Sequence, residues 1–237
     1  MRFERYDRIV DYYPQHWPLI VPGYLPILNA MLEIVWAYER RPHAVLDLGC
    51  GPGSATIAVA PACDPKGSIT LVDGSKAMLQ AAERVLHTNV REAIFGDFTN
   101  PTMEARIFGP HRYDLILSSF ALHHLEDVQK AKVISNAAAS LMPGGIFLLG
   151  DEIATDRPAG FLVIERVRAR IIQSQLENSH IMPAFWRLET TLPAELQLPF
   201  LPSRLEHLAT WMQQSGLAIC CPVAIFGSAL LVGVKPL

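Results

Sequence analysis

Residues 45–53 read Val45-Leu46-Asp47-Leu48-Gly49-Cys50-Gly51-Pro52-Gly53. A short apolar run ends close to an acid, and three glycines follow at alternate positions. Glycine lets the backbone approach a ligand closely, and a helix after such a turn points its free N–H groups at the site. The stretch therefore predicts a buried strand, a ligand-binding turn and a helix.

A second apolar run ends in an acid in the same way. Ile69-Thr70-Leu71-Val72-Asp73 is followed by Gly74-Ser75. A carboxylate at Asp73 can accept both hydroxyls of a ribose, because two adjacent donors suit one bidentate acceptor. The alternative role for Asp73 is a helix N-terminal cap. The two runs together indicate a nucleoside cofactor, and the G-x-G-x-G spacing differs by one residue from the fingerprint of dinucleotide-dependent oxidoreductases.

The rest of the chain alternates between apolar strands and amphipathic helices. The predicted strands cover residues 44–48, 68–72, 93–95, 113–118 and 146–150, and the main predicted helices cover 27–38, 54–60, 127–141 and a segment capped by Ser75. Such alternation predicts an α/β fold, a doubly wound, mostly parallel sheet covered on both faces. Residues 217–226 and 229–234 add a C-terminal antiparallel hairpin, which gives seven strands. Ligands bind such sheets at the carboxyl ends of the strands.

Two segments flank this pattern. Residues 1–42 form the predicted N-terminal helical cap, in which Pro14, Pro18, Pro22 and Pro26 interrupt the first half. Residues 43–237 form the cofactor-binding domain, and a helical insertion at about 155–203 interrupts it. Helices are also expected at 161–176 and 205–215. The stretch 177–203 is rich in proline and aromatic residues, and its length favours a lid or a substrate wall over a plain connector.

Composition excludes several classes of protein. The net charge is −3 and no cluster of Lys or Arg stands out, which argues against a nucleic-acid partner. No apolar run is long enough to span a bilayer, and acids occupy the N-terminal stretch, so we expect no membrane partner and a cytoplasmic location. The four cysteines form no C-x-x-C pair, so no metal site is predicted and the thiols are expected to be reduced. A homodimer remains open.

Three further motifs complete the pattern. Gly96-Asp97-Phe98 follows the third strand, residues 113–125 span the fourth strand and its loop, and Leu141-Met142-Pro143-Gly144-Gly145 leads into the fifth. Together with residues 45–53 and 71–79, they resemble the class I S-adenosylmethionine-dependent methyltransferases. The resemblance covers residues 27–150 by motif and 205–235 by pattern. It implies a Rossmann-like fold, S-adenosyl-L-methionine as cofactor, and in-line transfer of its methyl group to an O, N or C atom. A small-molecule acceptor is favoured, because the chain has no added recognition domain.

The resemblance also implies a role for each residue at the strand ends. The methionine part of the cofactor is bordered by Asp47, Gly49, Gly51 and Gly53. The ribose is held by Asp73, beside Gly74 and Ser75, and Met78 packs on the adenine. The adenine amino group donates to Asp97, and Gly96 and Phe98 belong to the same turn. The floor near the methyl group is lined by Ser118 and Phe120.

Catalytic groups are less clearly marked. Methyl transfer requires mainly that the nucleophile is held in line and that water is excluded. A general base is needed only for a nucleophile that arrives protonated. The candidate bases are His123, His124 and Glu152. The alternatives are that the histidines are structural and that the acid is solvated or caps a helix.

Aromatic side chains supply the candidate substrate residues. Tyr13 and Trp17 in the cap, and Trp186 in the insertion, can face the sulfonium and the substrate, because ring faces attract cations. They can equally pack the cap or the insertion against the sheet. Arg166, Arg168 and Arg170 offer a fork for a substrate carboxylate, although a solvated helix face is the favoured interpretation.

A narrower resemblance points to a different reaction. Val21-Pro22-Gly23-Tyr24 and Phe226-Gly227-Ser228 are similar to segments of carboxy-S-adenosylmethionine synthases. Those enzymes carboxylate the cofactor, which requires a positive group to hold the new carboxylate. The helix at 205–215 has no Arg or Lys after Arg204 and carries Trp211, so methyl transfer is favoured. A non-catalytic regulator that binds S-adenosylmethionine is the other alternative.

Overall fold

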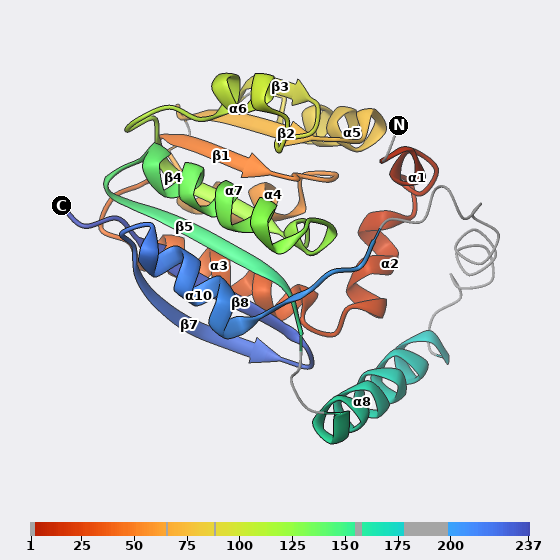
Figure 1. The fold of residues 1–237 in the computed structure, drawn as a ribbon. Coiled ribbons are helices and arrows are strands. Elements are labelled where there is room, and N and C mark those ends of the chain that lie inside the picture. The colour runs from red at the N-terminus through yellow and green to blue at the C-terminus, as the bar shows by residue number, and fades with distance from the viewer. Residues whose placement is uncertain (1–2, 65, 88, 155–157, 178–198) are drawn as a thin grey trace.

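The computed structural model describes residues 3–64, 66–87, 89–154, 158–177 and 199–237. A sheet with the strand order β3-β2-β1-β4-β5-β8-β7 runs through its centre, and the short β6 pairs with β5 beside it (Figure 1). The strands are β1 (Ala44–Leu48), β2 (Ser68–Asp73), β3 (Val90–Phe95), β4 (Tyr113–Ser119), β5 (Leu141–Ala154), β6 (Ser203–Arg204), β7 (Ala218–Ile225) and β8 (Ser228–Val234). The first five are parallel, and β8 is antiparallel to both β5 and β7. The predicted fold class is confirmed.

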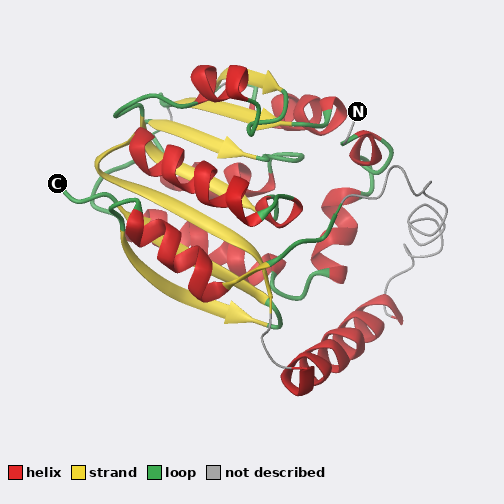
Figure 2. Ribbon diagram, in the orientation of Figure 1, coloured by secondary structure: helices red, strands yellow, loops and turns green. Residues whose placement is uncertain are grey.

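Helices cover both faces of this sheet (Figure 2). The helices are α1 (Glu4–Asp7), α2 (Tyr13–Ile20), α3 (Tyr24–Ala37), α4 (Ser54–Val59), η1 (Ala60–Ala62), α5 (Lys76–Leu86), α6 (Pro101–Ile107), η2 (Leu122–His124), α7 (Asp127–Ser140), α8 (Pro158–Glu177) and α10 (Leu205–Gln214). One core cluster joins α3, α4 and α5 to the sheet, and a second joins α6, α7 and α10 to its other face. This two-sided burial explains why β1 is apolar along its length.

The N-terminal segment forms a cap beside the carboxyl ends of the parallel strands. Ile9 and Tyr13 of this segment form a small cluster with Met78 of α5. Pro18 lies inside α2, and a bend of 102° separates α2 from α3. In the described part of the chain, no single helix has the length and apolar character of a membrane span, although α2 and α3 taken together pass that test.

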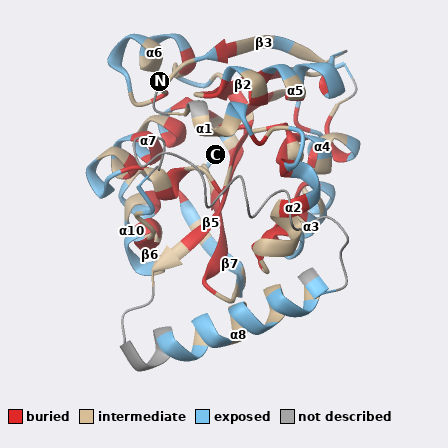
Figure 3. Cartoon of the chain, turned by 90° about the vertical axis from the view of Figure 1, so that its right-hand side faces the viewer, coloured by how far each residue is buried: buried red, intermediate tan, exposed pale blue. Residues whose placement is uncertain are grey.

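The main departures from expectation follow β5. This strand runs from Leu141 to Ala154 rather than from 146 to 150. Leu141 pairs with β4, β8 pairs with the strand as far as Glu152 opposite Ser228, and β6 pairs with its last two residues. Asp151 and Glu152 therefore lie within the strand. The following helix α8 lies at the side of the molecule and is largely exposed (Figure 3). Of the predicted insertion at about 155–203, residues 155–157 and 178–198, including Trp186, lie outside the described residues.

Candidate functional site

The glycine turn after β1 has the backbone conformation that its sequence predicts. Gly49 and Gly51 have φ values of +70° and +52°, which favour glycine over other residues. A Cβ atom on Gly49 would lie 2.4 Å from the Cβ of Ala121, in the loop after β4. The amides of Gly49 and Cys50 donate to the Val72 carbonyl of β2 at 2.9 and 3.0 Å. The turn is thus held between two neighbouring strands.

Asp73, at the end of β2, lies beside this turn. Its Oδ2 accepts from the Gly51 amide and its Oδ1 from the Ser75 amide, both at 2.7 Å. Burial raises the pKa of Asp73 to about 6, although both of these hydrogen bonds oppose the shift. Each carboxylate oxygen has a further lone pair. The group therefore fits a bidentate partner such as the two hydroxyls of a ribose.

Asp47 lies beneath the turn with one oxygen unsatisfied. Its Oδ2 accepts from the Thr56 hydroxyl at 2.6 Å, whereas Oδ1 is buried and has no hydrogen-bond partner among the described residues. Burial raises the pKa of Asp47 to about 7; the Thr56 hydrogen bond opposes this rise and the Asp73 charge adds to it. A buried carboxylate oxygen without a partner costs free energy, so it suits a site that receives a cationic group such as an ammonium. The residues present therefore fit the amino-acid part of S-adenosylmethionine.

A cleft lies over the ends of β3, β2, β1 and β4, and its volume is about 580 Å³ when the adjoining open solvent is included. Its lining is mostly aromatic and apolar, with acids along one side. The lining residues are Phe3, Tyr6, Tyr13, Gly49, Gly51, Asp73, Gly74, Met78, Gly96, Asp97, Phe98, Phe120, Ala121, His124 and Leu125. A smaller pocket of about 230 Å³ is lined by Tyr24, Cys50 and Ser54 among others, and it shares Tyr13 and two glycines of the turn with the cleft.

The cleft gathers most of the predicted cofactor residues but not all of them. Those in its lining are Gly49, Gly51, Asp73, Gly74, Met78, Gly96, Asp97, Phe98 and Phe120. The remaining predicted residues are Asp47, Gly53, Ser75 and Ser118, which are absent from the lining. Ser75 caps α5 by accepting from the Met78 amide, and the fully buried Ser118 donates to the Leu48 carbonyl. These two side chains therefore support the walls of the cleft.

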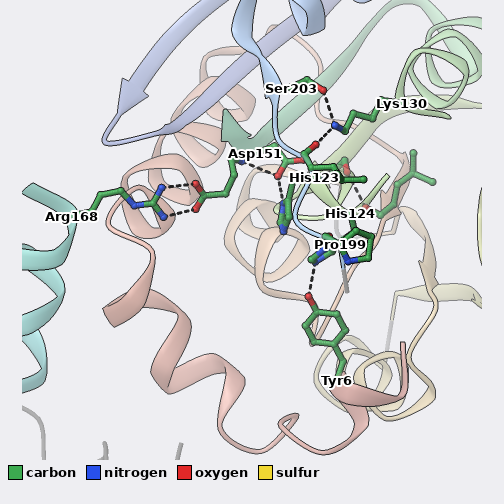
Figure 4. A network of polar contacts seen from close by, with 12 residues as sticks. Tyr6, His123, His124, Lys130, Asp151, Arg168, Pro199 and Ser203 are labelled. Atoms are coloured by element: carbon green, nitrogen blue, oxygen red, sulfur yellow. Dashed lines mark hydrogen bonds and ion pairs between the residues drawn. The ribbon is translucent and has the colours of Figure 1, made fainter. Parts of the chain in front are cut away.

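The predicted bases occupy three different surroundings (Figure 4). His123 lies behind the cleft, where its Nδ1 is 2.5 Å from Asp151 Oδ1 and its amide donates to Oδ2 at 3.0 Å. Glu152 accepts a bidentate pair of hydrogen bonds from Arg168 of α8, at 2.9 and 3.1 Å. Burial raises the pKa of Glu152, and the Arg168 charge opposes this rise. Of the three candidates, only His124 lines the cleft.

His124 has both ring nitrogens engaged. Nδ1 lies 2.9 Å from the Pro199 carbonyl oxygen, and Nε2 lies 2.7 Å from the Tyr6 hydroxyl. Burial and, to a smaller extent, the neighbouring His123 lower the pKa of His124 to about 3. The ring is therefore neutral near pH 7. Because a carbonyl can only accept, Nδ1 carries the proton, and Nε2 accepts the proton of Tyr6.

Of the two predicted substrate residues in the cap, one lines the cleft and the other packs against it. Tyr13 lines the cleft, and Trp17 stacks on it from behind, with ring centroids 4.2 Å apart. The sequence offered Tyr6 only as one of several cap aromatics that can face the sulfonium and the substrate, and it did not assign Phe3, Ala121 or Leu125 to the site. The aromatic content of the cap was the available signal for Phe3 and Tyr6. Across the described ranges, no group of three His, Cys, Asp or Glu side chains is placed to hold a metal ion.

Comparison with known proteins agrees with this geometry. A family model described as "Methyltransferase domain" matches residues 45–145. Carboxy-S-adenosyl-L-methionine synthase from Trichlorobacter lovleyi is 28% identical over 166 residues, which cover 66% of this chain and 64% of the synthase. The chain thus matches slightly less than two thirds of that relative's length.

Solved structures with low sequence identity share the fold. An O-methyltransferase family protein from Burkholderia thailandensis gives a TM-score of 0.65 at 19% identity, covering 99% of this chain and 62% of that protein. Human N-acetylserotonin methyltransferase, solved in complex with SAM, gives 0.57 at 15% identity, covering 100% and 57%. The predicted resemblance to the class I S-adenosylmethionine-dependent methyltransferases is confirmed, with S-adenosyl-L-methionine as the cofactor, and residues 45–145 are the part of the chain that matches the methyltransferase domain.

Proposed function

We propose that this chain transfers the methyl group of S-adenosyl-L-methionine to a small-molecule O, N or C acceptor. The observation that carries the proposal is one cleft in which Asp97, Asp73 and the glycine turn follow one another along the ends of β3, β2 and β1. Beyond them lie Phe120 after β4 and the rings of Tyr6 and Tyr13 from the cap. A methyl donor requires hydrogen-bond acceptors for its nucleoside, which the acids supply. Its acceptor requires an apolar surface beside the donor, which the aromatic rings supply.

The protein's own residues have mainly to bind, orient and exclude water. S-adenosylmethionine supplies an electrophilic methyl group on a positively charged sulfur. The rings of Tyr6, Tyr13 and Phe120 line the cleft and offer faces that attract such a cation. Phe120 is held at a φ of +52°, and its amide donates to the Gly150 carbonyl at 2.7 Å. This rigid wall keeps water from the reacting atoms and leaves orientation as the chief source of rate.

The second candidate is a carboxy-S-adenosylmethionine synthase, which the 28% identical relative favours. That activity needs a cation near the cofactor to hold the added carboxylate. None of the residues that line the described cleft is Lys or Arg, and α10 contains neither. Arg168, which the sequence suggested as a ligand for a substrate carboxylate, forms an ion pair with Glu152 instead. These features favour methyl transfer, and the enclosed aromatic wall also argues against a regulator without turnover.

The domain boundaries belong to the same proposal. The cap of residues 1–42 closes one side of the cleft, and residues 43–237 carry the catalytic domain. The insertion at about 155–203 would form a further part of the substrate wall. In this proposal Tyr13 and Trp186 contact the substrate and Trp17 supports Tyr13.

The proposal is tested by substitution of Asp73. In Asp73→Ala the ribose loses two charge-assisted hydrogen bonds, so S-adenosylhomocysteine should bind about 100-fold more weakly by titration calorimetry. Asp64→Ala is the matched control, because Asp64 caps an exposed turn by accepting from the Lys66 amide and should leave the affinity unchanged. Near-normal affinity in Asp73→Ala would contradict the proposed site.

The two candidate reactions are separated by the ligand that copurifies with the protein. Mass spectrometry that finds S-adenosylmethionine or S-adenosylhomocysteine supports methyl transfer. A species heavier by one carboxyl group would support the synthase instead.

A further inference from the structure

The hydrogen bond between Tyr6 and His124 spans the cleft from one side to the other. Tyr6 belongs to α1, which packs against α5 after β2, whereas His124 belongs to η2 after β4. Because β1 lies between β2 and β4 in the sheet, this bond passes over the end of β1 and its glycine turn. Figure 4 shows the Tyr6 ring reaching from the cap to His124. Tyr6 is thus held in place from both sides of the site.

The direction of this hydrogen bond determines what Tyr6 offers to a ligand. The neutral His124 ring donates through Nδ1 to the Pro199 carbonyl and accepts through Nε2. The single proton of the Tyr6 hydroxyl therefore points at His124. A phenol oxygen whose proton is engaged can make further hydrogen bonds only as an acceptor.

The position of Tyr6 along the cleft indicates which part of a ligand meets it. The residues suited to adenine and ribose follow β3 and β2, and the residues around His124 follow β4. Neighbouring strands lie about 4.8 Å apart, so the β4 side is roughly 10 Å from the ribose-binding end of β2. Ala121, Leu125 and Phe120 surround the same end of the cleft. This end is where a methyl acceptor would approach.

We propose that the Tyr6 hydroxyl receives the methyl acceptor, and that the acceptor is a hydroxyl or amine whose reacting atom carries a proton. The inference rests on the proposed methyl transfer and narrows it. The acceptor donates its proton in a hydrogen bond to Tyr6 Oη, which turns a lone pair of the same atom toward the methyl group. That lone pair forms the new bond to carbon, sulfur keeps the electrons of the bond that breaks, and the methylated product loses its proton to solvent as it leaves the cleft. His124 acts through Tyr6 and is a positioning residue.

The distribution of charge around His124 supports this division of roles. Its side chain is half-buried beside His123, and the positive charge of Arg5 in α1 disfavours its protonation, while Asp151 acts in the opposite sense. A ring with a pKa of about 3 is a poor store for a proton at neutral pH. The geometry instead suits a fixed acceptor that orients the Tyr6 hydroxyl.

The test compares two ligands that differ at the methyl position. S-adenosylhomocysteine has no group there, whereas sinefungin places an amine, which is a hydrogen-bond donor, at that point. Titration calorimetry would measure both affinities in the wild type and in Tyr6→Phe, which keeps the ring. We expect the wild type to prefer sinefungin by about 10-fold, the scale of one hydrogen bond to a charged group. Tyr6→Phe should lose that preference while its affinity for S-adenosylhomocysteine changes less than about 3-fold.

Two variants of His124 test the positioning role. Gln can accept from Tyr6 and donate to Pro199, so His124→Gln should keep most of the preference for sinefungin. Leu can do neither, so His124→Leu should lose it. If Tyr6→Phe weakens the binding of both ligands equally, Tyr6 only lines the cleft and the inference is overturned. An unchanged preference for sinefungin in Tyr6→Phe would overturn it as well. If the wild type binds neither ligand, the proposed methyl transfer itself fails, and the inference fails with it.

Discussion

Two buried carboxyl groups under one glycine turn make the ligand-free protein sensitive to pH. Asp47 has its pKa raised to about 7 and Asp73 to about 6, in both cases mainly by burial. Both values exceed those of the unfolded chain, so the folded state binds more protons between about pH 4 and pH 7. Stability contributed by the protonated forms is therefore lost as the pH rises through the folded pKa values.

This linkage gives a prediction for thermal unfolding. Between pH 5 and pH 7.5, the raised pKa values of Asp47 and Asp73 remove about 4 kcal/mol of stability from the ligand-free protein. The lowered pKa of His124 adds back about 2 kcal/mol over the same interval, because the folded state favours its neutral ring. The Tm should therefore fall by about 5 °C, since one kcal/mol corresponds to about 2–4 °C in a domain of this size. Asp47→Asn should flatten much of the slope, because the amide does not titrate. A wild-type Tm that rises steadily between pH 5 and pH 7.5 would contradict the predicted fall. Differential scanning calorimetry in matched buffers measures both.

At the scale of elements, Lys130 of α7 holds the end of the insertion. It is 1% exposed, and its ammonium donates to the Leu201 carbonyl, to Ser203 Oγ at 2.6 Å and to Asp127 Oδ1 at 3.3 Å. The adjoining strand β6 pairs with the end of β5, and the Leu201 amide donates to the His123 carbonyl. Lys130 thereby fixes the segment whose Pro199 carbonyl orients His124.

Removal of this ammonium should destabilise the fold. Lys130→Met leaves a carbonyl and a hydroxyl without their donor, at a cost of about 2 kcal/mol and a fall in Tm of about 5 °C. Lys132→Met is the matched control on the same helix, because its side chain is 54% exposed and pairs with Glu104 at the surface. Equal falls in the free energy of unfolding of the two variants would show that the buried contacts of Lys130 stabilise the fold no more than a surface ion pair does. Chemical unfolding measures the difference.

Elements with local signals were predictable, and contacts between distant segments were not. The strand end at Leu48 and the Ser75 cap follow from short-range patterns, and the structure agrees with them. The second strand ends at Asp73, one residue after the predicted end. The extent of β5 depends on pairing with β8, which no local pattern reveals. The bond from Tyr6 to His124 joins residues 118 positions apart, so only the folded chain brings that part of the site together.

At the scale of the whole molecule, the cap and the sheet meet at Asp7. Its Oδ1 accepts from the Ser75 hydroxyl at 2.6 Å and from the Ala77 amide at 2.9 Å, so α1 is fastened to the start of α5. A Cβ atom on Gly74 would lie 2.2 Å from the Phe3 ring, which shows how closely the cap covers the β2 side of the cleft. A ligand in the cleft is therefore partly enclosed by α1.

Loosening this attachment should change the exchange rate of the ligand. In Asp7→Ala, S-adenosylhomocysteine should dissociate about 5-fold faster, which corresponds to the loss of one typical hydrogen bond. Stopped-flow displacement measures the rate, and Asp11→Ala, an exposed acid of the same cap, serves as the control. A dissociation rate equal to that of the wild type would mean that α1 does not limit ligand exit.

The positions of the four thiols have a practical consequence for such measurements. Cys50 and Cys63 are buried, and burial raises the pKa of each, so neither forms a reactive thiolate readily. Cys220 and Cys221 are exposed on β7, at the edge of the sheet opposite β3 and separated from β4 by β5 and β8. A maleimide dye would therefore attach to β7 and leave the cleft clear. The native chain thus carries its own attachment point for a fluorescent reporter, without any engineered cysteine.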